Sequence, residues 1–187
     1  MDFAFIKRQW TPLPYPTTSF SGQTIIVTGS NIGLGLDAAR HFARLSAAKV
    51  ILAVRSIAKG EVAAKSIHDS IGKKGVCEVW QLDMGNWDSI REFVKRAEGL
   101  QRLDVVMENA GIAVFDYAQM EGMESTIAVN VVGTFLLALM LLPVLRRMGA
   151  KYGIVPKLVI TTSEVHGHVS SSFYFVGMFL EADNLRL

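Results

Sequence analysis

Residues 24–35 read TIIVTGSNIGLG, an apolar and β-branched run that leads into three glycines, Gly29, Gly33 and Gly35. The run from Thr24 to Thr28 is typical of a buried strand, and residues 33–46 have the composition and spacing of a helix. A strand, a glycine-rich turn and a helix N-terminus, in this order, are the setting in which proteins bind the phosphates of a dinucleotide. The stretch predicts the first unit of an α/β nucleotide-binding fold, and a glycine-rich turn without a ligand is the alternative.

The alternation of strand and helix continues along the chain. Further apolar runs predict strands at residues 49–54, 76–82, 103–107 and 157–161, and helical patterns lie at residues 56–71, 86–98 and 120–147. Strands separated by helices form βαβ units with right-handed crossovers, and strands without polar alternation suit a parallel sheet that is covered on both faces. We therefore expect an α/β fold with a doubly wound, Rossmann-like parallel sheet in the order 3-2-1-4-5 and helices on both faces.

The domain pattern begins after an N-terminal arm. Residues 1–20 carry prolines at positions 12, 14 and 16, which predicts an extended arm. Residues 21–187 then form a single dinucleotide-binding domain. This domain is incomplete, because the segment after the fifth strand is too short for the helix-and-strand units that would finish the sheet.

Composition excludes several classes of protein. The chain has 187 residues and a formal net charge of +2, with Lys and Arg spread along the sequence, so we expect no nucleic-acid partner. The single cysteine, Cys77, excludes an intramolecular disulfide, and the sequence has no Cys/His cluster with the spacing of a metal site. The N-terminus does not have the pattern of a secretory signal, so we expect a cytoplasmic protein.

One apolar segment is about as long as a membrane span. Residues 125–145 are nearly free of charge, but Asn130 lies within them and Gly133 and Pro143 interrupt them. The flanking segments have the pattern of a soluble α/β protein. We therefore expect a buried core helix here rather than a membrane helix, and no membrane partner.

Each glycine of the first loop has a predicted role. Gly29 allows the tight turn, Gly33 lets the backbone approach a phosphate, and Gly35 lets the helix pack against the strand. The backbone amides around Ile32 to Leu34 then face a pyrophosphate at the positive end of the helix. The residues of this loop that we predict to bind the cofactor are Gly29, Ser30, Ile32, Gly33, Leu34 and Gly35.

The end of the second strand indicates which nucleotide is bound. An NAD site usually carries an acid about 20 residues past the glycine loop, where it binds the ribose diol. Here Arg55 follows the strand, with Ser56 and Lys59 nearby and no carboxylate at that place. Because a guanidinium matches the oxygens of a 2′-phosphate, Arg55 predicts NADP(H) as the cofactor. A solvated arginine at a helix start is the alternative.

The loop spacing T-G-x-x-x-G-x-G resembles that of the short-chain dehydrogenase/reductase family, and further matches follow in the family's order over about residues 20–166. The resemblance implies that Asp83, at the end of the third strand, accepts from the adenine amino group, with a helix N-cap as the alternative. The segment Glu108-Asn109-Ala110-Gly111 resembles the family's N-N-A-G motif, which implies that Asn109 lines the nicotinamide ribose. Glu108 replaces the first Asn, and a carboxylate cannot donate the hydrogen bonds that an amide donates.

Two residues match catalytic positions of the family. Asn130, in the context V-N-V-x-G, is implied to hold a water in a proton relay, and a buried amide that is bonded to nearby backbone is the alternative. Ser163 follows Thr162 at the position of the catalytic serine, whose hydroxyl polarises a substrate carbonyl. Residues 164–166 resemble the retinol-dehydrogenase-like branch of the family and its fungal relatives.

The family's acid/base, a Tyr followed four residues later by a Lys, has no counterpart in this sequence. The residues found four positions after the four tyrosines are Ser19 after Tyr15, Glu121 after Tyr117, Pro156 after Tyr152 and Met178 after Tyr174. The last lysine is Lys157, which precedes Ser163. The chain therefore resembles the cofactor-binding front of such an enzyme, truncated before the rest of the active site.

Two functions are compatible with these residues. The first is an NADP(H)-dependent oxidoreductase that acts on a carbonyl or alcohol group of a small metabolite, with a role in secondary metabolism by analogy with fungal relatives. The second is a non-catalytic remnant that binds the nucleotide without turnover. The edge of the last strand leaves pairing with a second copy of the chain open.

Overall fold

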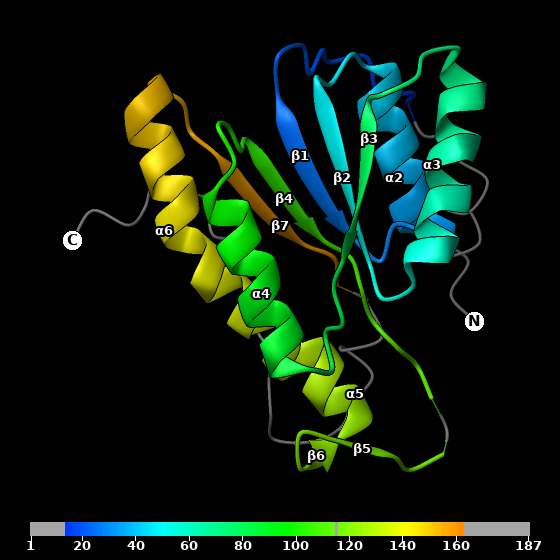
Figure 1. Cartoon of the computed structure of the whole chain (residues 1–187), viewed down its shortest axis with the longest axis vertical. Helices are drawn as coiled ribbons and strands as arrows, with labels where there is room; N and C mark the ends of the chain where they lie inside the picture. The colour runs from blue at the N-terminus through cyan, green and yellow to red at the C-terminus, as the bar shows by residue number, and fades with distance from the viewer. Residues whose placement is uncertain (1–13, 115, 163–187) are drawn as a thin grey trace, which may run out of the picture.

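The computed structural model describes residues 14–114 and 116–162. The predicted first strand is confirmed as β1, Thr24–Thr28, and all five of its residues are buried. β1 lies in the middle of a sheet of five strands, so its apolar side chains are covered on both faces (Figure 1). This central position explains why the run has no polar alternation.

The sheet has the predicted topology. Its strands run in the order β3-β2-β1-β4-β7, and every neighbouring pair is parallel. β7 is the fifth strand of the expected order 3-2-1-4-5. In the order of the sheet, the strands are β3 Cys77–Gln81, β2 Lys49–Val54, β1 Thr24–Thr28, β4 Val105–Glu108 and β7 Lys157–Ile160.

Helices cover both faces of the sheet, as expected for a doubly wound fold (Figure 1). α2 (Gly33–Arg44) and α3 (Ile57–Ile71) pack on the face that carries Ile25 and Val27. α4 (Trp87–Glu98) and the long helix α6 (Thr134–Tyr152) pack on the opposite face, which carries Ile26 and Val106. Alternate residues of each strand thus feed two separate hydrophobic clusters.

The helix starts follow the capping signals of the sequence. The Ser56 hydroxyl accepts a hydrogen bond from the Lys59 amide at 3.4 Å, and α3 begins at the next residue. The Asn86 side chain accepts from the Ser89 amide at 2.8 Å, so α4 begins after Asn86 rather than after Asp88. Both caps satisfy amides that have no partner within their helix.

The predicted helix over residues 120–147 is wrong at both ends. Its start is a two-stranded antiparallel hairpin, β5 (Gln119–Met120) and β6 (Met123–Glu124), whose turn holds Glu121 at a φ of 52°. The helical stretch begins with α5 (Ser125–Ile127), where the Glu124 carboxylate accepts from the amides of residues 126 and 127. It ends five residues later than predicted, because Tyr152 still lies in the helix and Gly153 terminates it in the left-handed conformation.

A wide turn interrupts this helical stretch. Between α5 and α6, the residues of η1 (Ala128–Gly133) form a π-helix. The Thr134 hydroxyl donates to the Val129 carbonyl at 3.2 Å, which stabilises the wide turn. At Gly133 the helix lies directly against the backbone carbonyl of Met84, which leaves no space for a side chain.

The stretch Ser125–Tyr152 is long and apolar enough to cross a membrane by length and composition, with a mean hydropathy of 2.4 over its most apolar window. Core helices of soluble proteins meet the same criterion. Here 44% of that most apolar part is buried inside the protein, where Leu137 and Leu141 belong to the hydrophobic cluster that contains Ile26 and Val106.

The two ends of the chain are described only in part. Within residues 14–20, Tyr15 packs edge-on against His41, and the Pro16 carbonyl accepts a hydrogen bond from Arg44 at 2.7 Å. The apolar residues 173–180 lie outside the described residues, as does the start of the predicted arm. Among the residues that the structure describes, β7 has β4 as its single strand neighbour and forms one edge of the sheet.

Candidate nucleotide-binding site

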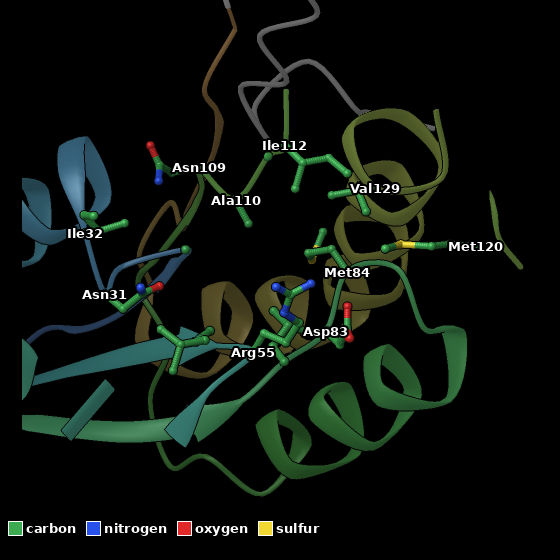
Figure 2. Close-up of a pocket in the computed structure, with 15 residues that line it drawn as sticks. Asn31, Ile32, Arg55, Asp83, Met84, Asn109, Ala110, Ile112, Met120 and Val129 are labelled. Atoms are coloured by element: carbon green, nitrogen blue, oxygen red, sulfur yellow. The ribbon is translucent and has the colours of Figure 1, made fainter. Parts of the chain in front are cut away.

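A cavity of about 290 Å³ lies at the carboxyl ends of the central strands. This is where a doubly wound sheet binds its ligand, because the strand order reverses there. Figure 2 shows side chains from segments far apart in the sequence around it, including Arg55, Asp83, Ala110 and Met120. Within the described part of the chain, no group of three or more His, Cys, Asp or Glu side chains could hold a metal ion.

The glycine loop forms one wall of the cavity. Gly29 has a φ of 65°, and a Cβ at this position would lie 2.9 Å from the Cα of Ala110. The close approach of these two backbones brings the glycine loop and the end of β4 together. A side chain at Gly29 would separate them, so the loop geometry depends on this glycine.

The N-terminus of α2 opens toward the loop without a side-chain cap. Its N-cap residue is Ile32, which is extended, 72% exposed and unable to accept a hydrogen bond from the first turn. Gly33 follows with a φ of 59° and open space around its Cα. Uncapped amides at a helix N-terminus favour an anion, and this arrangement fits a pyrophosphate.

Not every predicted loop residue lines the cavity. Gly29 and Ile32 do, whereas Ser30, Gly33, Leu34 and Gly35 are not among its lining residues. Ser30 is fully buried and its hydroxyl donates to the Val27 carbonyl at 2.8 Å, so it stabilises the turn from within. The Leu34 side chain is 74% exposed.

Gly35 and Asn109 meet beneath the loop. A Cβ on Gly35 would lie 2.6 Å from the Gly29 carbonyl oxygen and 2.5 Å from the Asn109 amide nitrogen. That Asn109 amide donates to the Thr28 carbonyl at 3.2 Å, while the backbone amides of Asn109 and Ala110 both donate to the Thr28 hydroxyl at 2.9 Å. These bonds join the end of β4 to β1 and place Asn109 at the cavity.

Arg55 provides positive charge at the cavity. It follows β2, lines the cavity and has an exposed side chain. It forms no hydrogen bond or ion pair with another residue that the structure describes, so its guanidinium is available to a ligand. Among the described residues that line the cavity, Asp83 is the one that carries a carboxylate.

Asp83 lies at the end of β3 and lines the same cavity. Its carboxylate accepts from the Gly85 amide at 3.0 Å, and its own amide donates to the Ser89 hydroxyl at 2.9 Å. Asp83 is therefore not the N-cap of α4, which is Asn86. Its bonds fix the turn between β3 and α4 and leave its second carboxylate oxygen, Oδ2, without a hydrogen-bond partner in the described part of the chain.

Asn130 is exposed, contrary to the expected buried amide. It lies in η1, where its side-chain oxygen accepts from the Ile112 amide at 2.8 Å and its nitrogen donates to the Ile112 carbonyl at 2.7 Å. This pair of hydrogen bonds joins the helix to the segment after β4, which lines the cavity. The amide is bonded to nearby backbone, as in the alternative, but it is solvent-exposed rather than buried.

Ser163 lies outside the described residues, so the structure does not place it. The described chain ends at Thr162, two residues past β7, and the Thr161 amide donates to the Glu108 carbonyl at 2.8 Å. β7 therefore ends beside β4, at the cavity edge of the sheet.

Glu108 is 2% exposed, and neither of its carboxylate oxygens has a hydrogen-bond partner in the described structure. Burial raises the pKa of the Glu108 carboxyl to about 8. From the sequence we expected only that Glu108 cannot donate the hydrogen bonds that an Asn would donate at this position. The sequence gave no indication that the Glu108 side chain would be buried.

The sequence missed several apolar lining residues, among them Ile112, Met120 and Val129. Met120 was assigned to a helix, but it lies in the hairpin β5–β6 and its sulfur packs directly against Gly85. Glu121 anchors this hairpin by accepting from the Trp87 amide at 3.0 Å. The Gly122 that follows Glu121 was the available sequence signal for a turn.

Comparison with known proteins identifies the family. Residues 23–175 match the short chain dehydrogenase family. The chain belongs to the short-chain dehydrogenase/reductase family. Its curated relatives are fungal: it is 45% identical over 171 residues to the short chain dehydrogenase FGM9 of Gibberella zeae and 48% identical over 171 residues to the short chain dehydrogenase atnD of Emericella nidulans. These matches cover 91% and 90% of this chain but 50% and 54% of the relatives, so the chain spans about half their length.

Solved structures of short-chain dehydrogenases have the same fold. A short chain dehydrogenase of Escherichia coli complexed with NADPH is 29% identical and matches 81% of this chain and 63% of its own, with a TM-score of 0.66. A short-chain dehydrogenase of Sphingobium yanoikuyae in complex with NADPH is 24% identical and covers 78% of this chain and 55% of its own, with a TM-score of 0.65. The second likeness shows the fold alone.

Proposed function

We propose that this chain binds NADP(H) and is part of an oxidoreductase that acts on a carbonyl or alcohol group of a small metabolite. The observation that carries the proposal is the exposed Arg55 at the end of β2, which lines the same cavity as Gly29 and Ile32 and has no hydrogen-bond or ion-pair partner among the described residues. Family members of the same fold bind NADPH, including the Escherichia coli protein. A role in secondary metabolism is part of the proposal by analogy with fungal relatives alone.

The residues of the cavity fit a dinucleotide phosphate. The uncapped N-terminus of α2 would hold the pyrophosphate. Gly29, which lies close to Ala110, adds no side chain between this helix end and the pyrophosphate. Arg55 would hold the 2′-phosphate, and Asp83 would accept from the adenine. When bound, the nucleotide supplies the hydride of the reaction.

The remaining residues would position the reacting groups. Asn109, fixed by Thr28, would line the nicotinamide ribose. Ser163 would donate a hydrogen bond to the substrate oxygen, and Asn130 would order the proton relay.

A second candidate function is nucleotide binding without turnover. It is favoured by one observation of the sequence, that no Tyr in the chain is followed four residues later by a Lys. Without that pair, the substrate oxygen has no positioned proton donor. The proposal and this candidate agree on the cofactor and differ on catalysis.

Two measurements test the proposal in sequence. Fluorescence titration with NADPH tests binding, and failure to bind contradicts both candidates. Consumption of NADPH in the presence of a panel of ketones and aldehydes then tests turnover. Turnover that Ser163→Ala abolishes supports the oxidoreductase, whereas binding without any turnover supports the non-catalytic candidate.

A further inference from the structure

Glu108 is an acid enclosed in the core beside the nucleotide cavity. It is the last residue of β4, and the cavity-lining residues Asn109 and Ala110 follow it directly. Its side chain is 2% exposed, and both carboxylate oxygens are buried without a hydrogen-bond partner in the described structure. A buried, unpaired carboxylate costs far more free energy than a neutral carboxylic acid.

The surroundings of Glu108 follow from the sheet register. Val106, two residues earlier, packs in the cluster that faces α4 and α6, so Glu108 points to the same face. In β7 its register partner is Ile160, and in β1 the register continues to Thr28. These neighbours are an aliphatic side chain and a hydroxyl that already accepts two hydrogen bonds from the amides of residues 109 and 110.

No charge from these elements faces Glu108. β1, α5 and η1 contain no titratable residue, and Lys157 of β7 is exposed at the opposite end of its strand. The titratable side chains of α4 and α6 are all exposed: Asp88, Arg91, Glu92, Lys95, Arg96 and Glu98 on α4, and Arg146, Arg147, Lys151 and Tyr152 on α6. Burial alone therefore raises the pKa of Glu108, to about 8.

We propose that Glu108 is a positioning residue of the nucleotide cavity: as a neutral acid it holds the carboxyl end of β4 in place, and loss of its proton loosens residues 109–112. Ionisation releases the proton to solvent and leaves a carboxylate that must be hydrated. Water reaches it by opening the end of β4, where residues 109–112 are held by Thr28 and Asn130. The nucleotide part of this proposal rests on the proposed function, whereas the loosening does not.

The described hydrogen bonds provide reporters for the opening. The amides of Asn109 and Ala110 donate to Thr28, the Ile112 amide donates to Asn130, and the Thr161 amide donates to the Glu108 carbonyl. Amide hydrogen exchange at these four positions is measured from about pH 5 to about pH 9 in the 187-residue chain and in Glu108→Gln. At each amide, the exchange rate of wild type is divided by that of Glu108→Gln, which removes the effect of pH on the intrinsic rate of exchange. The Val50 amide, which donates to the Val76 carbonyl, is the internal reference.

We expect the ratio of wild-type to Glu108→Gln exchange to rise at least about tenfold between about pH 5 and about pH 8 and then to level off. The Val50 amide reports the pH-dependent change in stability of the whole fold, and the four reporter amides are expected to exchange faster than Val50 at each pH because they open locally. Glu108→Met, a second neutral replacement of similar size, reproduces the behaviour of Glu108→Gln. Glu92→Gln removes an exposed carboxylate from α4 and keeps the wild-type profile. A ratio that is constant with pH at all four reporter amides overturns the proposal.

Nucleotide affinity is the second readout. The ratio of the dissociation constants of NADPH, wild type over Glu108→Gln, is expected to rise over the same pH range, because the loosened segment lines the cavity. A rising exchange ratio with a constant affinity ratio overturns the role in the cavity. If no variant binds NADPH while the exchange ratio still rises, the hold of Glu108 on residues 109–112 is supported and the proposed function is contradicted.

Discussion

At the scale of single residues, the proposed preference for NADP(H) rests on Arg55. It is the exposed cation at the end of β2, and it has no partner in the described chain. Its fork of N–H donors matches a phosphate, whereas a ribose diol would require an acceptor. The proposed choice of NADP(H) over NAD(H) can therefore be tested at one side chain.

Arg55→Asp is expected to weaken NADPH binding by about 1.5–3 kcal/mol, roughly a ten- to hundred-fold rise in dissociation constant, because one charge-assisted phosphate contact is lost. NADH binding is expected to hold or improve, since a carboxylate can accept from the ribose hydroxyls. Fluorescence titration of both nucleotides measures the change. Arg91→Asp makes the same change of charge on the exposed face of α4 and serves as the control. An NADPH affinity that Arg55→Asp leaves unchanged would show that Arg55 does not contact the 2′-phosphate.

Glu108 adds a pH dependence to the stability of the fold. Its pKa is raised by burial from an ordinary value of 4.5 to about 8, so the folded state binds its proton more tightly than the unfolded state. Its contribution to stability is therefore fully present below about pH 4.5 and is lost progressively as pH rises to about 8, at up to about 1.4 kcal/mol per pH unit.

Glu108→Gln is expected to gain stability relative to wild type over that range, by about 2 kcal/mol or more between about pH 5 and about pH 8. Urea unfolding of both proteins at several pH values measures the difference. Two free energies of unfolding that change with pH in parallel would mean that the Glu108 carboxyl ionises normally in the folded protein.

At the scale of elements, the sequence predicts the βαβ units well and the hairpin poorly. The strands and first helices carry local signals, such as apolar runs and the caps at Ser56 and Asn86, and the structure confirms them. The hairpin β5–β6 consists of two two-residue strands, which are too short for any periodicity. For the same reason, the sequence did not predict that Met120 of this hairpin lines the cavity. The enclosure of Glu108 depends on packing between β4, β7 and η1, which no local pattern records.

The π-helix η1 provides an element-scale prediction. Gly133→Ala is expected to destabilise the fold by about 1–3 kcal/mol, because the new Cβ would overlap the Met84 carbonyl oxygen, a backbone atom that cannot rotate away as a side chain would. Gly99→Ala places its Cβ at an ordinary 3.4 Å from the Arg96 carbonyl oxygen and is the matched control, with a small expected effect. Thermal or urea unfolding compares the two. Equal effects would indicate that η1 shifts readily to admit a side chain.

At the scale of the whole molecule, the chain spans about half the length of the curated relatives FGM9 and atnD. It belongs to a family whose proton transfer depends on a Tyr and a Lys that this sequence lacks. General acid catalysis contributes about 10²–10⁴-fold to rates, so the 187-residue chain is expected to reduce carbonyls at least that much more slowly than full-length relatives. Side-by-side assays of NADPH consumption with the fungal relatives measure the ratio. Comparable rates would mean that another group of the chain, or water, delivers the proton.

The central claim is that these residues form an NADP(H) site, and titration of the unmodified chain with NADPH and NADH tests it most directly. The proposed contact of Arg55 with the 2′-phosphate predicts that NADPH binds at least about tenfold more tightly than NADH. Equal affinities for the two nucleotides, or binding of neither, would contradict the account.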